Sequence, residues 1–191
     1  MLTVLIADHD ATRATQLEQA FRDQGYGVAG VVNSAFELAA AVAAHAPDII
    51  IIGTDSPDRD TLEHLCLATR DCPRPVVMFT QDDASESIRA ALKAGVSAYV
   101  VDGLDTERIR PILEVARVRF EEHQILLRNA TETARKTHER HLIDAAKRKL
   151  MTHQDLSEDA AYHAMRRTAM SENRRLVEVA ESILQQLGQH G

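Results

Sequence analysis

The chain has 191 residues, of which 45% are hydrophobic, enough apolar surface for one or two packed cores. No apolar run approaches the roughly 20 residues that a membrane span needs, and the first residues begin a strand without a basic leader segment, so we expect a cytoplasmic protein. The formal net charge of −7 argues against indiscriminate binding to phosphate groups. Any nucleic-acid site must therefore be a local basic patch.

The chain changes character after Gly103. Residues 104–187 contain no glycine and a single proline, Pro111. The charge changes as well, because residues 1–134 hold 12 Lys and Arg against 21 Asp and Glu, whereas residues 135–191 hold 10 against 8. These shifts indicate an acidic α/β module followed by a more basic, all-helical module.

In the first module, short apolar runs alternate with patterns of helical spacing. Continuous apolar runs are typical of strands that are buried on both faces. The expected strands are residues 2–7, 28–32, 49–52, 76–80 and 98–101. The expected helices are residues 11–24, 35–44 with Ser34 as N-cap, 61–69 and 85–94. Five consecutive βα units predict a flavodoxin-like, doubly wound parallel sheet, in which ligands bind at the carboxyl ends of the strands.

The second module has the pattern of three helices. No helix breaker occurs between Pro111 and Asp155, so one long helix is expected, and Ser157 and Ser171 are placed to cap two further helices. Alanine-rich helices with apolar stripes of this kind pack as a small bundle.

The middle of the long helix carries a thin apolar seam. Phe120, Leu127, Ala130 and Ala134 recur every three, four or seven residues. Two interpretations stay open: a solvated spacer helix, or a coiled coil over residues 119–138 that joins two copies of the chain. We favour the coiled coil, and with it a homodimer.

The cysteines and histidines form no metal-binding pattern. Cys66 and Cys72 are six positions apart, which fits neither a CxxC motif nor a metal site and indicates ordinary reduced thiols. His138 and His141 lie one helical turn apart, but no third ligand follows at zinc spacing. No phosphate-binding glycine loop or Ser-His-Asp arrangement is present either. We expect no cofactor and no enzymatic activity.

Three stretches of the first module resemble the receiver domain of bacterial response regulators. They are VLIADHD at 4–10, PDIIIIGTDSP at 47–57 and AGVSAY at 94–99, and the resemblance covers residues 1–118. Receivers take a phosphoryl group onto an aspartate, which requires a carboxylate nucleophile, acidic groups for Mg²⁺, a hydroxyl and a lysine.

That chemistry is incomplete here. The degenerate pocket comprises Asp8, His9, Asp10, Gly53, Asp55, Thr80 and Asp102. Gly53 stands at the nucleophile position without a side chain, His9 replaces an acidic residue, and Asp102 puts a negative charge where a lysine is expected. Asp55, two positions later, is the only obvious substitute acceptor. We therefore expect a pseudo-receiver that is regulated by protein contact, with at most weak Mg²⁺ binding by Asp8 and Asp10.

Basic residues cluster on each helix of the second module. The candidate RNA-binding residues are Lys147, Arg148, Lys149, Tyr162, Arg166, Arg167, Arg174 and Arg175. Arginine forks suit phosphate groups, and guanidinium planes stack on unpaired bases. Tyr162 either stacks on a base or closes the edge of the core, and the sequence leaves both interpretations open.

The second module, over residues 139–188, resembles the ANTAR domain. The matching stretches are AAKRKLM at 145–151, LSEDAAY at 156–162, MRRTAMS at 165–171 and RRLVEVAE at 174–181. A receiver-like domain followed by a coiled coil and an ANTAR domain resembles the AmiR/NasT family of transcription antiterminators. The stretches SPDRD at 56–60, PRPVVMFT at 73–80 and AGVSAYVVDG at 94–103 are similar to its NasT subgroup, which itself has an aspartate where Gly53 stands.

The resemblance implies a specific function. Such a protein binds leader RNA with paired stem-loops, controls nitrate or nitrite assimilation genes, and is restrained by a nitrate-sensing partner of the NasS type. Two alternatives are a DNA-binding response regulator and a phosphorylatable two-component switch. Few base-reading side chains in the last helix argue against the first, and Gly53 argues against the second.

Overall fold

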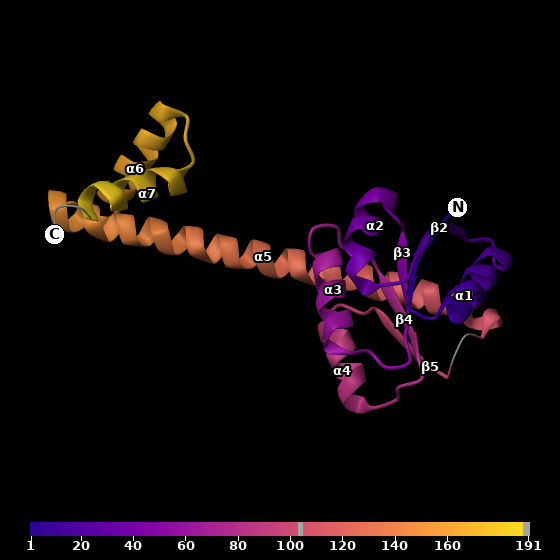
Figure 1. The fold of residues 1–191 in the computed structure, drawn as a ribbon. Coiled ribbons are helices and arrows are strands. Elements are labelled where there is room, and N and C mark those ends of the chain that lie inside the picture. Colours follow the sequence, from indigo (N-terminus) through magenta and orange to yellow (C-terminus); the bar gives the residue numbers. More distant parts are fainter. Residues whose placement is uncertain (103–104, 189–191) are drawn as a thin grey trace. The chain divides into compact units, whose positions relative to one another are not determined.

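The computed structural model describes residues 1–102 and 105–188, which form two compact units (Figure 1). The first unit extends from Met1 to Gln124, and the second begins at Ile125. The dividing point lies inside one continuous helix, α5 (Ile109–Gln154). The sequence-based boundaries at 118 and 138 also fall inside this helix, and they stay predictions.

The first unit contains a five-stranded parallel sheet, as predicted. The strands are β1 (Thr3–Asp8), β2 (Gly27–Val32), β3 (Ile49–Gly53), β4 (Val76–Thr80) and β5 (Ala98–Val101). Their order is β2-β1-β3-β4-β5, so the winding reverses between β1 and β3. The last residues of these two strands, Asp8 and Gly53, are paired partners in the register.

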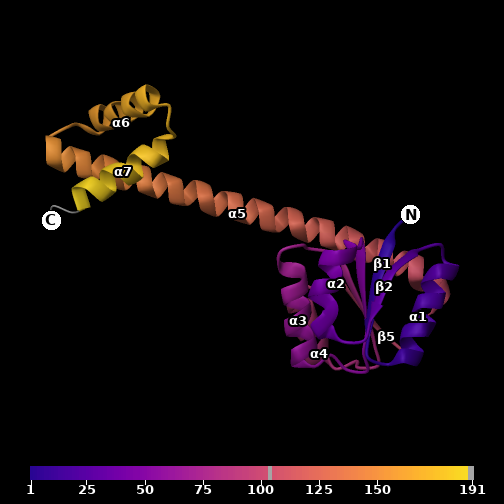
Figure 2. The same ribbon diagram turned by 45° about the horizontal axis from the view of Figure 1, so that its top comes forward.

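Helices cover both faces of this sheet. Those of the first unit are α1 (Ala11–Asp23), the 3₁₀ turn η1 (Ala35–Glu37), α2 (Leu38–His45), α3 (Arg59–Arg70), α4 (Ser85–Lys93), the 3₁₀ turn η2 (Thr106–Arg108) and the first part of α5. Helices α1 and α5 pack on one face, and α2, α3 and α4 pack on the other (Figure 2).

The sheet has a hydrophobic core on each of its two faces, and this explains the apolar runs of its strands. In β1, Val4 and Ile6 enter the core under α1 and α5, whereas Leu5 enters the core under α2 and α3. Successive side chains of a strand point to opposite faces, so a strand with a core on both sides needs an uninterrupted apolar run. This is why the sequence predicted the strands to within one residue at each end.

One helix of the first unit starts later than predicted. Ser34 does act as a cap, because its hydroxyl accepts a hydrogen bond from the amide of Phe36 at 3.2 Å. The segment that it caps is the 3₁₀ turn η1, and the α-helix itself begins only at Leu38.

The second unit packs the last part of α5 against α6 (Glu158–Glu172) and α7 (Leu176–Gly188). Its core contains Ala146, Ala161, Met165 and Ala180. The small side chains let the three helix backbones approach closely. Helix α5 ends just before Asp155, whose φ of 49° no helix accommodates.

The predicted cap at Ser157 is confirmed, but the predicted cap at Ser171 is wrong. Ser157 accepts a hydrogen bond from the amide of Ala160, whereas Ser171 lies inside α6 and donates its hydroxyl to the carbonyl of Thr168. Helix α6 continues to Glu172 and ends at Asn173, which has a left-handed φ of 51°. Asparagine tolerates this conformation, so the chain turns there, two residues later than the serine suggested.

None of the described helices combines the length and the apolar character that crossing a lipid bilayer requires.

Candidate functional site

The carboxyl end of β1 presents a buried carboxylate held by an arginine fork. Asp8 is 3% exposed, and it accepts hydrogen bonds from Arg13 Nε to Oδ2 at 2.6 Å and from Nη2 to Oδ1 at 2.9 Å. The amide of Asp10 adds a third bond, to Oδ1 at 2.9 Å. Charge-assisted bonds of this two-pronged kind are among the strongest in proteins, so the position of Asp8 is tightly defined.

The same arginine also reaches the loop after β3. Its Nη1 donates to the carboxylate of Asp55, which is otherwise largely exposed. The hydrogen bond to Asp8, helped by the one to Asp55, raises the pKa of Arg13 above its usual range. A single guanidinium thus bridges two of the carboxylates in the predicted pocket.

Gly53 lies directly beside this pair. A β-carbon built on Gly53 would lie 1.9 Å from Asp8 Oδ2 and 2.7 Å from its carboxyl carbon. The Asp8 carboxylate therefore fills the space that any side chain at position 53 would need.

Thr80 at the end of β4 is buried and fully engaged. Its hydroxyl donates to the main-chain carbonyl of Asp55 at 2.9 Å and accepts from the amide of Asp82 at 3.1 Å. The phenol of Tyr99 in turn donates to the carbonyl of Asp82 at 2.9 Å, and partial burial raises the pKa of Tyr99. These bonds join the ends of β3, β4 and β5.

The other members of the predicted pocket are not drawn into this cluster. His9 is exposed and lines an open cavity of about 390 Å³, together with Gly53 and His64. Asp102 follows β5 with a φ of 69°, and it makes no hydrogen bond or ion pair with any residue that the structure describes.

Asp10 has a structural task. Its carboxylate accepts the amides of Thr12 at 2.8 Å and Arg13 at 3.1 Å, which caps α1 and lowers the pKa of Asp10. Within residues 1–102 and 105–188, no group of three or more His, Cys, Asp or Glu side chains is arranged to hold a metal ion. Asp8 and Asp55, which Arg13 bridges, are among the residues that the sequence singles out, whereas Arg13 is not, because it looks like an ordinary helix arginine.

Two of the predicted RNA-binding arginines lie on α6 without an ion-pair partner among the described residues. Arg166 and Arg167 are exposed and pair with no other described residue. Tyr162, one turn earlier, is 39% exposed and lies outside the core of the unit. Part of the Tyr162 side chain is therefore exposed to solvent, and its role toward RNA stays a prediction.

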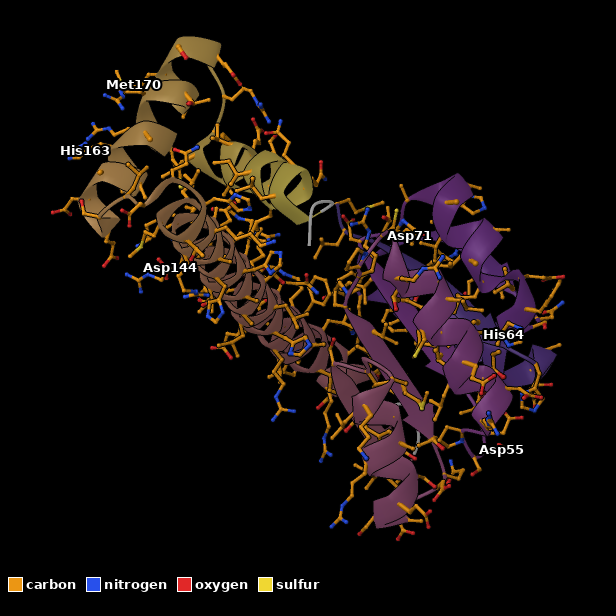
Figure 3. All side chains as sticks on the ribbon, turned by 90° about the vertical axis from the view of Figure 1, so that its left-hand side faces the viewer. Asp55, His64, Asp71, Asp144, His163 and Met170 are labelled. Atoms are coloured by element: carbon orange, nitrogen blue, oxygen red, sulfur yellow. The ribbon has the colours of Figure 1, made fainter. Side chains whose placement is uncertain are left out.

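Two residues that the sequence analysis did not single out share this surface. His163 packs edge to face against Tyr162, and Met170 is 73% exposed. Figure 3 shows both on the side of α6 that is turned away from α7. The available signal was their spacing from Arg166, because His163 precedes it by three positions and Met170 follows it by four, about one helical turn in each direction. We call Tyr162, His163, Arg166, Arg167 and Met170 the α6 face.

Some basic residues at the end of α5 pair with other residues of the bundle, and one does not. Lys147 is held between Asp144 and Glu158, each 2.8 Å away, and these carboxylates raise the pKa of Lys147. Lys149 donates to the carbonyl of Leu187 at 3.0 Å, so it braces the end of α7. Arg148 is exposed and its side chain makes no hydrogen bond within the described part of the chain.

Arg174 and Arg175 are tied into the turn between α6 and α7. Arg174 donates to Ser182 Oγ at 2.7 Å and to the carbonyl of Glu178 at 3.0 Å. Arg175 reaches Glu139 on α5 and lowers the pKa of that carboxyl. The structure therefore separates the eight predicted contacts into four that are free for a ligand and four that stabilise the bundle. Their roles toward RNA stay predictions.

Comparison with known proteins identifies both units. The response regulator receiver domain family matches residues 4–114, and the ANTAR domain family matches residues 131–184. The transcriptional regulatory protein PdtaR of Mycobacterium tuberculosis H37Rv is 28% identical over 97% of this chain and 90% of its own length. The nitrate regulatory protein of Klebsiella oxytoca is 48% identical over 46 residues, which cover 24% of this chain and 12% of that protein.

Solved structures agree on the fold of the first unit. A pilus assembly-related protein of Burkholderia pseudomallei has a TM-score of 0.57 and 25% identity over 62% of this chain and 91% of its own. The chemotaxis protein CheY4 of Vibrio cholerae has a TM-score of 0.54 and 20% identity over 60% of this chain and 97% of its own. The chain therefore belongs to the response regulator receiver family, and it carries an ANTAR domain after its receiver domain.

Proposed function

We propose that this protein is an RNA-binding transcription antiterminator whose ANTAR domain binds leader-RNA stem-loops through the α6 face. The observation that carries the proposal is the pair of exposed arginines, Arg166 and Arg167, which pair with no other described residue and lie one helical turn after the partly exposed Tyr162. In a chain with a net charge of −7, two adjacent arginines without a carboxylate partner among the described residues form a local site for anions.

The chemistry of the face suits a folded RNA with an unpaired loop. Guanidinium groups bind phosphates along the stem, and an aromatic ring stacks on a base that the loop splays out. Holding the stem-loop would keep its strands from joining an alternative terminator hairpin. Met170, about two helical turns after Tyr162, adds an exposed apolar side chain on which a second base can pack.

A dimer would present two such faces to paired stem-loops. Ile125, Leu126 and Leu127 on α5 are 55%, 66% and 48% exposed, and no element of the described chain covers them. Successive residues of a helix are rotated by about 100° around its axis, so these three side chains are spread over about 200° of the helix circumference. The contact with a single second helix is narrower than this and covers two of the three side chains. We infer that a second copy packs along this part of α5 as a coiled coil.

Regulation is proposed to come from a protein partner. The NasT-like stretches and the match to a nitrate regulatory protein support a role in nitrate or nitrite assimilation, with a NasS-type nitrate sensor as the partner. Gly53 supports control by contact, because position 53 offers no atom to phosphorylate. Incubation with acetyl phosphate and Mg²⁺ should leave the protein unlabelled, and a label on Asp55 would contradict this part of the proposal.

The decisive experiment removes the free charges of the α6 face. R166A/R167A should weaken binding to a two-hairpin leader RNA by about 10- to 100-fold at fixed salt, because two phosphate contacts are lost, and its thermal melt should match the wild type. The matched control is R89A/R110A, which removes two exposed helix arginines of the receiver unit that pair with no residue the structure describes.

Duplex DNA serves as the competitor in the same titration. RNA binding that survives excess duplex at physiological salt supports the antiterminator. Equal competition by duplex DNA would instead support a DNA-binding regulator, and an unchanged RNA affinity in R166A/R167A would show that the surface is wrongly assigned.

A further inference from the structure

The receiver fold implies a Mg²⁺ ion held by carboxylates at the carboxyl end of the sheet, and the residues present here do not fit it. Mg²⁺ demands near-octahedral oxygen ligands with free lone pairs. Both oxygens of Asp8 already accept bonds from Arg13, and Asp10 Oδ1 accepts two amides of α1, which holds the Asp10 carboxylate in place as the cap of that helix. Gly53 contributes no side chain at all. A guanidinium 2.6 to 2.9 Å from the Asp8 oxygens would also repel a divalent ion.

Arg13 supplies the pocket with a cation from inside the chain. Its three donor nitrogens are shared between Asp8 on β1 and Asp55 after β3. The planar fork of arginine matches carboxylates in this way, whereas a lysine would act only as a point charge. The positive charge of Arg13 thereby offsets one of the two negative charges and lies between both carboxylates, without any ion from solution.

Gly53 and Arg13 depend on each other. The Asp8 carboxylate can turn toward Arg13 only because position 53 lacks a β-carbon, which would approach Asp8 Oδ2 to 1.9 Å. A side chain at position 53 would push Asp8 away and break the fork. The glycine that removes the phosphorylation site is thus also the residue that makes room for the internal cation.

The bridge is continuous with the hydrogen bonds of the neighbouring loop. The carbonyl of Asp55, whose side chain Arg13 holds, accepts the Thr80 hydroxyl at 2.9 Å and the Gln81 amide at 3.2 Å. Three strand ends are therefore tied together through one residue, Asp55.

We propose that Arg13 is a built-in counter-ion that takes the place of the divalent cation in this receiver and holds the loop after β3 in one fixed arrangement. The pocket is then ordered without metal or phosphate. The inference concerns the receiver unit alone, so an experiment that finds no RNA binding does not contradict it.

Titration of the full-length protein with Mn²⁺, followed by electron paramagnetic resonance, tests this directly. Wild type should show no site filled below about 1 mM, whereas R13Q should bind Mn²⁺ at least about tenfold more tightly, because a positive charge next to Asp8 is gone. The matched control is R22Q, which removes another arginine of α1 that pairs with Glu18 away from the pocket. R22Q should behave as wild type does.

Thermal melts give a second readout on the same proteins. At constant ionic strength, MgCl2 should raise the melting temperature of R13Q and leave that of wild type unchanged, since a ligand stabilises only the state that binds it. Equal Mn²⁺ affinity in wild type and R13Q would overturn the proposal. If R13Q does not fold, nuclear magnetic resonance of the wild-type protein tests the proposal. Broadening of the His9 and Gly53 amide resonances at Mn²⁺ concentrations below about 1 mM would overturn the proposal, and resonances that persist would support it.

Discussion

At the scale of single residues, Gly53 decides what the receiver can do. Its missing side chain removes a phosphate acceptor and also admits the Asp8 carboxylate into the space beside the strand. A mutation at this position therefore tests the packing as well as the chemistry.

The substitution Gly53→Ala should destabilise the receiver unit by about 1–3 kcal/mol, because the new methyl group forces Asp8 off Arg13 or shifts the strand. Urea unfolding of the full-length protein measures this cost. Gly30→Ala is the control, since a β-carbon there meets Leu5 at 3.3 Å and requires only a small adjustment. Equal destabilisation by the two substitutions would show that Asp8 moves freely.

Arg174 shows that a basic residue in this domain can serve the fold. Arg174→Ala should destabilise the helical unit by about 1 kcal/mol, because Ser182 and the Glu178 carbonyl lose a charged donor. Once the protein is folded, its RNA affinity should stay within about twofold of wild type, unlike that of R166A/R167A. Filter binding at low temperature measures the affinity, and a large loss there would place Arg174 in the RNA contact.

At the scale of elements, one ion pair connects the turn before α7 with α5. Arg175 keeps the pKa of Glu139 below its ordinary value of 4.5, so the ionised carboxylate is favoured in the folded state. The stabilisation is therefore complete above about pH 4.5 and is lost as the pH falls through the lower, folded-state pKa.

Glu139→Gln should accordingly reduce the stability of the second unit at pH 7, and its difference from wild type should shrink as the pH falls from about 4.5 through the lowered pKa of Glu139, because the wild-type carboxyl then becomes protonated as well. Circular dichroism melts across this pH range provide the measurement. Glu181→Gln is the control, because Glu181 is exposed and pairs with no described residue. A constant difference between Glu139→Gln and wild type at all pH values would contradict the assignment.

At the scale of the whole molecule, the apolar residues along α5 predict how many copies assemble. I125S/L127S should shift the protein from dimer to monomer in sedimentation equilibrium, because apolar surface that a second helix would cover is lost. N129S/T133S changes two polar positions of the same helix and should leave the dimer intact. A wild type that sediments as a monomer at high concentration would refute the coiled coil.

The same pair of variants tests the need for two RNA-binding faces. Affinity for a two-hairpin RNA should fall by at least about tenfold in I125S/L127S, while affinity for a single hairpin should be unchanged, because linked sites bind at a high effective concentration. Equal losses for both RNAs would mean that the substitutions damage the α6 face itself.

The sequence alone determined the strands, the helical tail and the identity of both domains. Strands buried on both faces need unbroken apolar runs, and residues 49–52, four consecutive isoleucines, meet this local requirement. The end of α6 was misplaced because Ser171 has the chemistry of a cap, while the choice between cap and helix interior depends on packing against α5 and α7.

Only the tertiary structure decided which charged residues are free. Arg13 and Asp55 lie 42 positions apart, and Lys147 meets Glu158 only because two helices pack together. A pattern of basic residues cannot distinguish an arginine that binds RNA from one that braces a turn, since both are favoured on exposed helix faces. Pairing with a distant carboxylate makes the difference, and the fold alone brings such partners within hydrogen-bonding distance.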